Sequence, residues 1–213
     1  MKKRLLPFLL IGMIASFYGC TEESNTTSEA SISAGTDGKA PGFSLVGSDG
    51  KTHSLSDHKG KFVVLEWSNF GCPFVKKHYD GGDMQKLQAE FAAQGVVWYL
   101  INSSAEGKQG HVNASTAPAT HAKMAPASKA ILLDLDGKVG RLYNAKVTPH
   151  MYIINPEGDL IYQGAIDSIR STDSSDVAKA TNYVKEALNA AMAGKPIAET
   201  NTKAYGCSVK YAK

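Results

Sequence analysis

The sequence predicts an α/β fold in which a mixed central β-sheet is covered by helices on both faces. Two continuous apolar runs, FVVL at 62–65 and VVWYLI at 96–101, are typical of strands that are buried on both sides. A helical segment lies between them and completes a parallel βαβ unit. Two later strands, at 151–154 and 160–162, flank the turn NPEGD, so an antiparallel hairpin joins the same sheet.

The first half of the folded region begins near Ala40. Residues 43–46 and 52–55 flank the turn SDGK and are expected to form a hairpin. A helix is expected from Pro73 to about Ala93. It is interrupted at Gly81-Gly82, because two consecutive glycines break or kink a helix.

The second half alternates short elements. Residues 103–128 are small and polar and predict a loop with one short helix, followed by a strand at 131–133 and a helix at 138–145. The last helix is predicted from an apolar stripe, and Gly194 and Pro196 end it. The stripe consists of Val177, Ala180, Val184, Leu188 and Ala191.

The N-terminal residues predict export. A basic start is followed by an apolar run, Leu5 to Phe17, that is too short to span a bilayer, and Gly19 precedes Cys20. This pattern resembles a bacterial lipoprotein signal, in which Cys20 becomes the acylated first residue of the mature protein. The alternative is an ordinary signal peptide with a chance cysteine, which also implies export. Because Thr21 follows rather than aspartate, the analogy implies a lipid anchor in the outer membrane that faces the periplasm.

Four segments are therefore expected. They are a signal peptide at 1–20, a flexible linker at 21–39, a folded domain at 40–194, and a C-terminal tail at 195–213 that carries Cys207. Removal of the signal takes away three basic residues and leaves 20 basic against 20 acidic side chains. A neutral chain without a basic patch does not favour nucleic acid as a partner.

Cys72, in NFGCPFVKKHY, follows a predicted buried strand and precedes Pro73 at the first helical position. The start of a helix carries unpaired N–H groups and a partial positive charge, which favours thiolate over thiol. Lys76, Lys77 and His78 are expected to add positive charge nearby. The alternative is a buried, inert cysteine, but the Gly-Cys-Pro turn favours a reactive one.

Three stretches, EWSNFGCPFVKKHY, VTPHMYIINPEGDLIYQGAID and AYGCSVKY, together resemble the peroxiredoxin-like (AhpC/TSA-like) branch of the thioredoxin-fold redoxins over residues 40–213. The resemblance implies a thioredoxin fold. Cys72 matches the first, attacking cysteine of the thioredoxin motif, and Val75 stands where the second would be. Peroxiredoxins carry their peroxidatic cysteine at that second position after a Pro-x-x-x-Thr pattern. Residues 67–73 lack this pattern, which argues against peroxidase activity of that type.

The resemblance also implies roles for other residues. Glu66 lies where thioredoxins carry a buried acid that relays protons to the cysteines, although a glutamate on a polar rim is the alternative. Val147-Thr148-Pro149 resembles the cis-proline loop. In that fold the loop packs against the active cysteine, and the backbone just before the proline pairs with a bound polypeptide.

Cys207 is the candidate partner of Cys72. If Cys20 carries lipid, these two cysteines remain, and an even pair in an oxidising compartment predicts a disulfide. Cys207 would then either resolve mixed disulfides on Cys72 or close the tail as a static bond. Both alternatives require the two residues to lie within disulfide reach.

The sequence thus favours an exported thiol-disulfide oxidoreductase with Cys72 as reactive thiol and Cys207 as resolving partner. It would act on a protein or small-molecule disulfide, or on a peroxide, and an external thiol would supply electrons. We expect no metal and no cofactor. The alternatives are an atypical thiol peroxidase that uses the same residues and a non-catalytic binding module with a structural disulfide.

Overall fold

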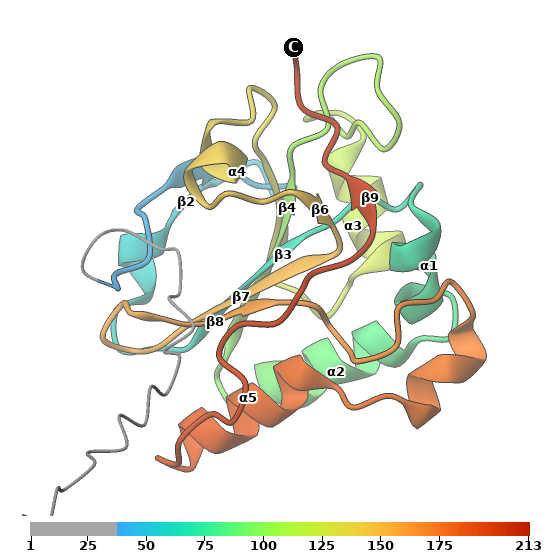
Figure 1. The fold of residues 1–213 in the computed structure, drawn as a ribbon. Helices are drawn as coiled ribbons and strands as arrows, with labels where there is room; N and C mark the ends of the chain where they lie inside the picture. The colour runs from blue at the N-terminus through green and yellow to red at the C-terminus, as the bar shows by residue number, and fades with distance from the viewer. Residues whose placement is uncertain (1–37) are drawn as a thin grey trace, which may run out of the picture.

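The computed structural model describes residues 38–213 (Figure 1). The predicted signal peptide, Cys20 and nearly all of the predicted linker lie outside the described residues. Within the described part of the chain, no helix combines the length and apolarity that crossing a membrane requires.

A five-stranded mixed sheet forms the centre of the molecule, with strand order β5-β4-β3-β7-β8. The three parallel strands are followed by two strands that are antiparallel to their neighbours. This is the sheet of the thioredoxin fold and confirms the predicted fold class. The strands are β3 (Val63–Trp67), β4 (Val97–Asn102), β5 (Ala130–Leu133), β7 (His150–Ile154) and β8 (Leu160–Gly164).

Each face of the sheet buries its own apolar cluster, because side chains alternate along a strand. Val64, Leu100 and Ile153 lie in the cluster that includes residues of α1 (Pro73–Tyr79), α2 (Asp83–Ala92) and α5 (Tyr183–Met192). The opposite face carries Leu65, Tyr99 and Tyr152. It is covered by α4 (Lys138–Leu142) together with residues of the N-terminal segment, including Phe43 and Leu55.

The smaller elements follow the sequence analysis closely. The predicted hairpin and loop helix are confirmed, and the helix predicted at 138–145 is shorter than expected. The hairpin consists of β1 (Ser44–Val46) and β2 (Thr52–Ser54), and the loop helix is α3 (Ala117–Met124). Leu55, expected in the second hairpin strand, instead begins a 3-10 helix that was not predicted, η1 (Leu55–His58).

The helix predicted from Pro73 to about Ala93 is divided at Gly81-Gly82, as expected. Gly82 has a φ of +78°, in the left-handed region that glycine adopts without strain, and it precedes the first residue of α2. The break lets α1 and α2 take separate directions.

The prediction for the last helix is wrong at its beginning. Residues Ser174–Lys179 form a separate 3-10 helix, η2, and α5 begins at Tyr183. The Asn182 side chain accepts a hydrogen bond from the Lys185 amide and caps α5. Asn182 also pairs with Asp167 through a backbone bridge, so the chain cannot continue one helix through this point.

The C-terminal tail is packed along the sheet and contains a short strand near its end. It passes β8, where the Gln163 backbone bonds to Thr200 and Thr202, and then crosses to β6 (Val147–Thr148). There β9 (Cys207–Ser208) pairs antiparallel with β6, as the red segment in Figure 1 shows. The tail therefore carries Cys207 from the β8 edge of the central sheet to β6, beside the proline loop.

We expect Asn182→Ala to lower the free energy of unfolding by about 1 kcal/mol, because it removes the side-chain cap of α5. Asn189→Ala is the matched control, since Asn189 is exposed within the same helix and alanine is a better helix former. Urea titrations of both variants measure the difference. Equal stabilities would contradict the capping role.

Candidate active site

Cys72 stands at the junction of β3 and α1. It is the N-cap residue of α1, and its carbonyl accepts hydrogen bonds from the amides of Val75 and Lys76. Its side chain is completely buried. The thiol lies 3.2 Å from the carbonyl oxygen of Thr148, to which it donates, and the Thr148–Pro149 peptide bond is cis. The predicted proline loop thus packs against the predicted cysteine.

The tail brings Cys207 to the same place. In the β6–β9 pair, Cys207 is opposite Thr148, and its side chain packs against the cluster that contains Cys72. Hydrogen bonding from the Cys207 side chain and backbone lowers the pKa of the Cys72 thiol. The two residues are not joined by a disulfide in this structure. The structure therefore brings together the two cysteines that the sequence analysis paired.

Gly206 makes this approach possible. Its φ is +146°, and a Cβ atom there would lie 2.0 Å from the carbonyl oxygen of Thr148. Any side chain would therefore force β9 away from β6. Glycine lets the tail backbone come close enough to place Cys207 against Cys72.

The two sulfurs differ in acidity. Burial raises the pKa of Cys72, but hydrogen bonding from Cys207 and the backbone outweighs it, so the pKa lies below that of an ordinary thiol. Burial, the hydrogen bond to Cys72 and repulsion from its thiolate raise the pKa of Cys207 to about 11. Cys72 is therefore the sulfur that ionises first and the stronger candidate nucleophile.

The expected contribution of Lys77 and His78 to the charge near Cys72 is wrong. Both side chains are buried, and the Lys77 ammonium is bound to Asp167 at 2.7 Å. Burial lowers the pKa of His78 to about 4, so this residue is neutral at pH 7. The acidity of Cys72 depends on its hydrogen bonds instead.

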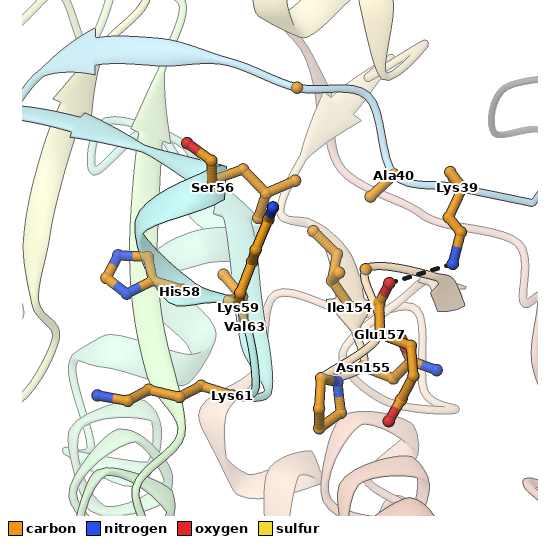
Figure 2. Close-up of a pocket in the computed structure, with 14 residues that line it drawn as sticks. Lys39, Ala40, Ser56, His58, Lys59, Lys61, Val63, Ile154, Asn155 and Glu157 are labelled. Atoms are coloured by element: carbon orange, nitrogen blue, oxygen red, sulfur yellow. Dashed lines mark hydrogen bonds between the residues drawn. The ribbon is translucent and has the colours of Figure 1, made fainter.

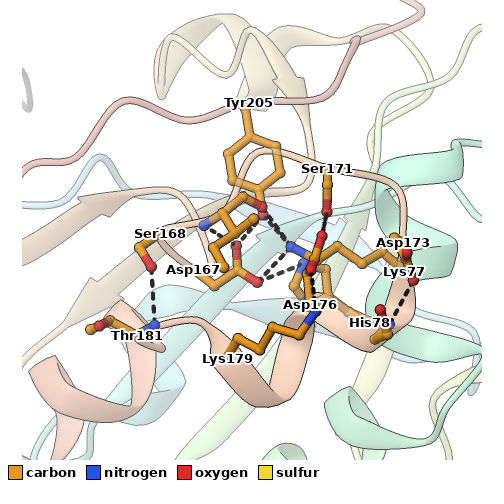
Figure 3. A network of polar contacts seen from close by, with 12 residues as sticks. Lys77, His78, Asp167, Ser168, Ser171, Asp173, Asp176, Lys179, Thr181 and Tyr205 are labelled. Carbon is orange, nitrogen blue, oxygen red and sulfur yellow. Dashed lines mark hydrogen bonds and ion pairs between the residues drawn. The ribbon is translucent and has the colours of Figure 1, made fainter.

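Lys77 belongs to a buried polar cluster that includes a tail residue (Figure 3). Its Nζ atom donates to Asp167, to the Ile169 carbonyl at 2.6 Å and to the Tyr205 hydroxyl at 3.2 Å. Tyr205 donates to the other carboxylate oxygen of Asp167. The sequence analysis did not identify Asp167 or Tyr205. The available signal was the position of Tyr205, two residues before Cys207.

Glu66 is fully buried rather than on a polar rim. Its carboxylate accepts hydrogen bonds from Tyr79 at 2.7 Å, Trp98 at 3.0 Å and Gln88 at 3.3 Å. Burial raises its pKa. Among the described residues, no hydrogen bond joins Glu66 to either cysteine, so the proton relay stays a prediction.

The backbone of Thr148 is already paired with the tail. The resemblance implied that this backbone binds a substrate polypeptide, and here β9 of the same chain occupies that edge. Because Cys72 has no exposed surface, an external molecule can reach its sulfur only if the surrounding structure moves.

A separate hollow of about 350 Å³ lies on the opposite face of the sheet (Figure 2). Val63 and Ile154 contribute apolar surface to it, and the exposed Lys59 and Lys61 also line it. The residues predicted for thiol chemistry do not line this hollow.

A model of the AhpC/TSA family matches residues 36–163, which is more than half of the chain. The chain belongs to the AhpC/TSA family. It is a redoxin with the thioredoxin fold, as the sequence resemblance implied. The matched residues include Cys72, Thr148 and Pro149 and end before Cys207.

Two relatives from Bacillus subtilis resemble this redoxin. The thiol-disulfide oxidoreductase ResA is 31% identical over 131 residues, which cover 62% of this chain and 66% of that protein, just under two thirds of its length. The thioredoxin-like protein YneN is 30% identical over 159 residues, which cover 74% of this chain and 87% of that protein.

Two solved structures share the redoxin's fold, each with a TM-score of 0.70. A hypothetical protein from Sinorhizobium meliloti is 23% identical, and the match covers 85% of this chain and 96% of that one. An uncharacterized conserved protein from Geobacillus kaustophilus is 24% identical, with 82% and 90% covered.

We expect the Cys207→Ala variant to raise the apparent pKa of Cys72, because it removes the hydrogen bond that contributes most to lowering it. The rate of Cys72 alkylation by iodoacetamide follows its thiolate, so the midpoint of the pH profile should move to higher pH. The variant could also expose Cys72 to the reagent, but greater exposure would change the plateau rate at high pH and leave the midpoint of the pH profile where it is. An unmoved midpoint would show that Cys207 does not tune Cys72.

The same assay with Glu66→Gln tests the proton relay. If Glu66 exchanges protons with the cysteines, the amide should alter the pH profile of Cys72. An unchanged profile would reject the relay and leave Glu66 as a buried hydrogen-bond acceptor.

Proposed function

We propose that this redoxin is a thiol-disulfide oxidoreductase in which Cys72 reacts first and Cys207 resolves the product. The observation that carries the proposal is that β9 packs Cys207 against the buried Cys72, beside the Thr148 carbonyl to which Cys72 donates. The lowered pKa of Cys72 and the raised pKa of Cys207 support the same assignment. A purely structural disulfide would also require Cys72 and Cys207 to be in contact, but it would not depend on a difference between their pKa values. The relative ResA is a thiol-disulfide oxidoreductase, which supports the same chemistry here.

The first step is attack of the Cys72 thiolate on a disulfide R–S–S–R. A bond forms between the Cys72 sulfur and one substrate sulfur, the substrate S–S bond breaks, and RS⁻ leaves. The mixed disulfide carries no charge on Cys72. This removes the repulsion that raises the pKa of Cys207, so Cys207 ionises more readily once it is needed.

The second step closes the Cys72–Cys207 disulfide. The Cys207 thiolate attacks the Cys72 sulfur, and the second RS⁻ leaves. The substrate has then gained two electrons and two protons, and the two cysteines have lost them. An external thiol returns the pair to the dithiol form. It would attack the partly exposed Cys207 sulfur, because the low-pKa Cys72 is the better leaving group.

The polypeptide-binding edge suggests how a protein substrate would engage. The tail occupies β6 with a cysteine opposite Thr148, which is the arrangement that a substrate strand carrying a disulfide would adopt. We therefore propose that the tail yields this edge to an extended substrate segment and takes it back when Cys207 closes the disulfide.

Single-turnover reactions with oxidised glutathione test the mechanism. Wild type should release two thiols per chain and form the internal disulfide, whereas Cys207→Ser should release one and stay glutathionylated at Cys72. Cys72→Ser should lose about thirtyfold or more of the rate, because the remaining Cys207 would be an ordinary thiol, about 3% ionised at pH 7. Mass spectrometry identifies each product.

Other outcomes would select other functions. Rapid hydrogen peroxide turnover that requires Cys72 would favour the thiol peroxidase. An internal bond that glutathione cannot reduce would identify a static staple in a binding module, since structural disulfides usually lie below about −300 mV.

We also propose that the protein is exported and anchored at Cys20 in the outer membrane, as the basic start and apolar run imply. An oxidising compartment would then supply the disulfides on which Cys72 acts. N-terminal mass spectrometry of the membrane fraction should detect a diacylglyceryl and fatty-acyl group on Cys20. A free N-terminus with no lipid would reject the anchor.

A further inference from the structure

We propose that Lys77, Asp167 and Tyr205, here called the tail clamp, position Cys207 for the ring-closing step. The proposal rests on the proposed function, because it concerns attack of Cys207 on a mixed disulfide at Cys72. The three residues are positioning residues, since their side chains act through the tail backbone and do not touch the reacting sulfurs.

The tail clamp connects the two cysteines through three elements. Lys77 lies on α1, the helix that Cys72 begins, and Asp167 lies in the loop after β8. Tyr205 stands two residues before Cys207. Figure 3 shows the Tyr205 ring descending from the tail so that its hydroxyl lies between the ammonium and the carboxylate. Tyr205 therefore fixes the position of the tail relative to α1, the helix that Cys72 begins.

The Lys77–Asp167 ion pair has hydrogen-bond partners even without Tyr205. Lys77 Nζ donates to Asp167 and to the Ile169 carbonyl, and the Ile169 amide donates to Asp167 at 3.1 Å. These bonds join α1 to the loop after β8 without any tail atom. The Tyr205 hydroxyl enters the group as both donor and acceptor, so its bonds act on the tail alone.

Burial makes this attachment directional and strong. The Lys77 side chain has no exposed surface, and that of Asp167 is 3% exposed. Hydrogen bonds to charged groups are stronger than those between neutral groups, and burial of Lys77 strengthens them further. Asp167 and Tyr205 also line a surface hollow of about 250 Å³, so water reaches the outer side of the cluster. The Tyr205 ring also meets the Phe74 ring of α1 edge to face, with centroids 5.8 Å apart.

The clamp fixes one side of Cys207, and backbone pairing fixes the other. Downstream, the Val209 amide donates to the Lys146 carbonyl at 3.0 Å, and the Ala105 amide donates to the Lys210 carbonyl at 2.8 Å. Between the two attachments stands Gly206, which permits the close crossing at Thr148. Cys207 is therefore held in a short segment with both ends fixed.

This arrangement matters most in the mixed disulfide. A substrate group on Cys72 must displace Cys207 from its contact, while the rate of closure depends on how often Cys207 returns in line with the new S–S bond. If Tyr205 keeps its hydrogen bonds while Cys207 is displaced, β9 can pair again with β6 in the same register and bring Cys207 back to the Cys72 sulfur. Closure then forms the Cys72–Cys207 bond, breaks the bond from Cys72 to the substrate sulfur and releases RS⁻.

Tyr205→Phe tests the clamp with the smallest change, because it keeps the ring packing and removes the hydroxyl. Stopped-flow reaction with 5,5′-dithiobis(2-nitrobenzoate) measures both steps, the first in a Cys207→Ser background and the second as release of the second thiolate. Closure should slow on the order of tenfold, the usual worth of a hydrogen bond to a charged group. The first step should be unchanged or faster, because a looser tail uncovers Cys72.

Tyr99→Phe is the matched control. Its hydroxyl bonds to His53 and His58 on the other face of the sheet, away from the tail, so both steps should keep the wild-type rate. The paired variant Lys77→Met/Asp167→Asn removes both buried charges together and should slow closure as Tyr205→Phe does. Removing a single charge would leave its partner unpaired and disturb folding.

The outcomes separate the clamp from the proposed function. If wild type closes its disulfide and Tyr205→Phe closes it equally fast, the clamp is rejected and the oxidoreductase stands. If Tyr99→Phe slows closure as much as Tyr205→Phe, the effect is general destabilisation and the clamp is again rejected. If wild type never releases a second thiolate, the proposed function fails, and the clamp fails with it.

Discussion

The two-residue pairing between β6 and β9 is the interaction on which the candidate site depends. It places Cys207 opposite Thr148, whose carbonyl oxygen lies 3.2 Å from the Cys72 sulfur. The thioredoxin motif normally supplies its second cysteine from the same helix, three residues along. Here Val75 fills that position, and a residue separated from Cys72 by 134 others supplies the second sulfur. Backbone hydrogen bonds replace short sequence spacing as the means of keeping the two sulfurs together.

Because Cys207 comes from a distant segment of the chain, its surroundings differ from those of Cys72. This difference accounts for the unequal pKa values of the two thiols. Cys72 lies within the core, whereas Cys207 is partly exposed. Each sulfur also changes the acidity of the other, because the first to ionise gains a hydrogen bond and makes the second ionisation harder. The proposed order of the two steps, Cys72 first and Cys207 second, is consistent with this difference in acidity.

The sequence alone predicted those features that depend on residues close together in the chain. Continuous apolar runs predicted the buried strands β3 and β4. The Gly-Cys-Pro and Thr-Pro stretches predicted, through a family resemblance, that the proline loop packs against Cys72. The tail clamp was not predictable, because charged residues such as Lys77 and Asp167 normally face solvent. Their burial results from three segments that meet in the folded chain. The prediction of where the last helix begins was wrong for the same reason. The apolar stripe continues across Asn182, but the backbone bridge from Asn182 to Asp167 interrupts the helix, and α5 begins at Tyr183.

The tail also covers an edge of the central sheet. Gly47 pairs with Leu132 along β5, and Asn201 pairs with Gln163 along β8, so both outer strands have part of their backbone occupied. Release of the tail would leave β8 and β6 as open edges that can template another strand. The tail of a second copy has the matching sequence, and two open molecules would be able to exchange tails and close as a symmetric dimer. The lifetime of the open state would then determine the protein concentration at which each Cys72 begins to meet the Cys207 of another chain.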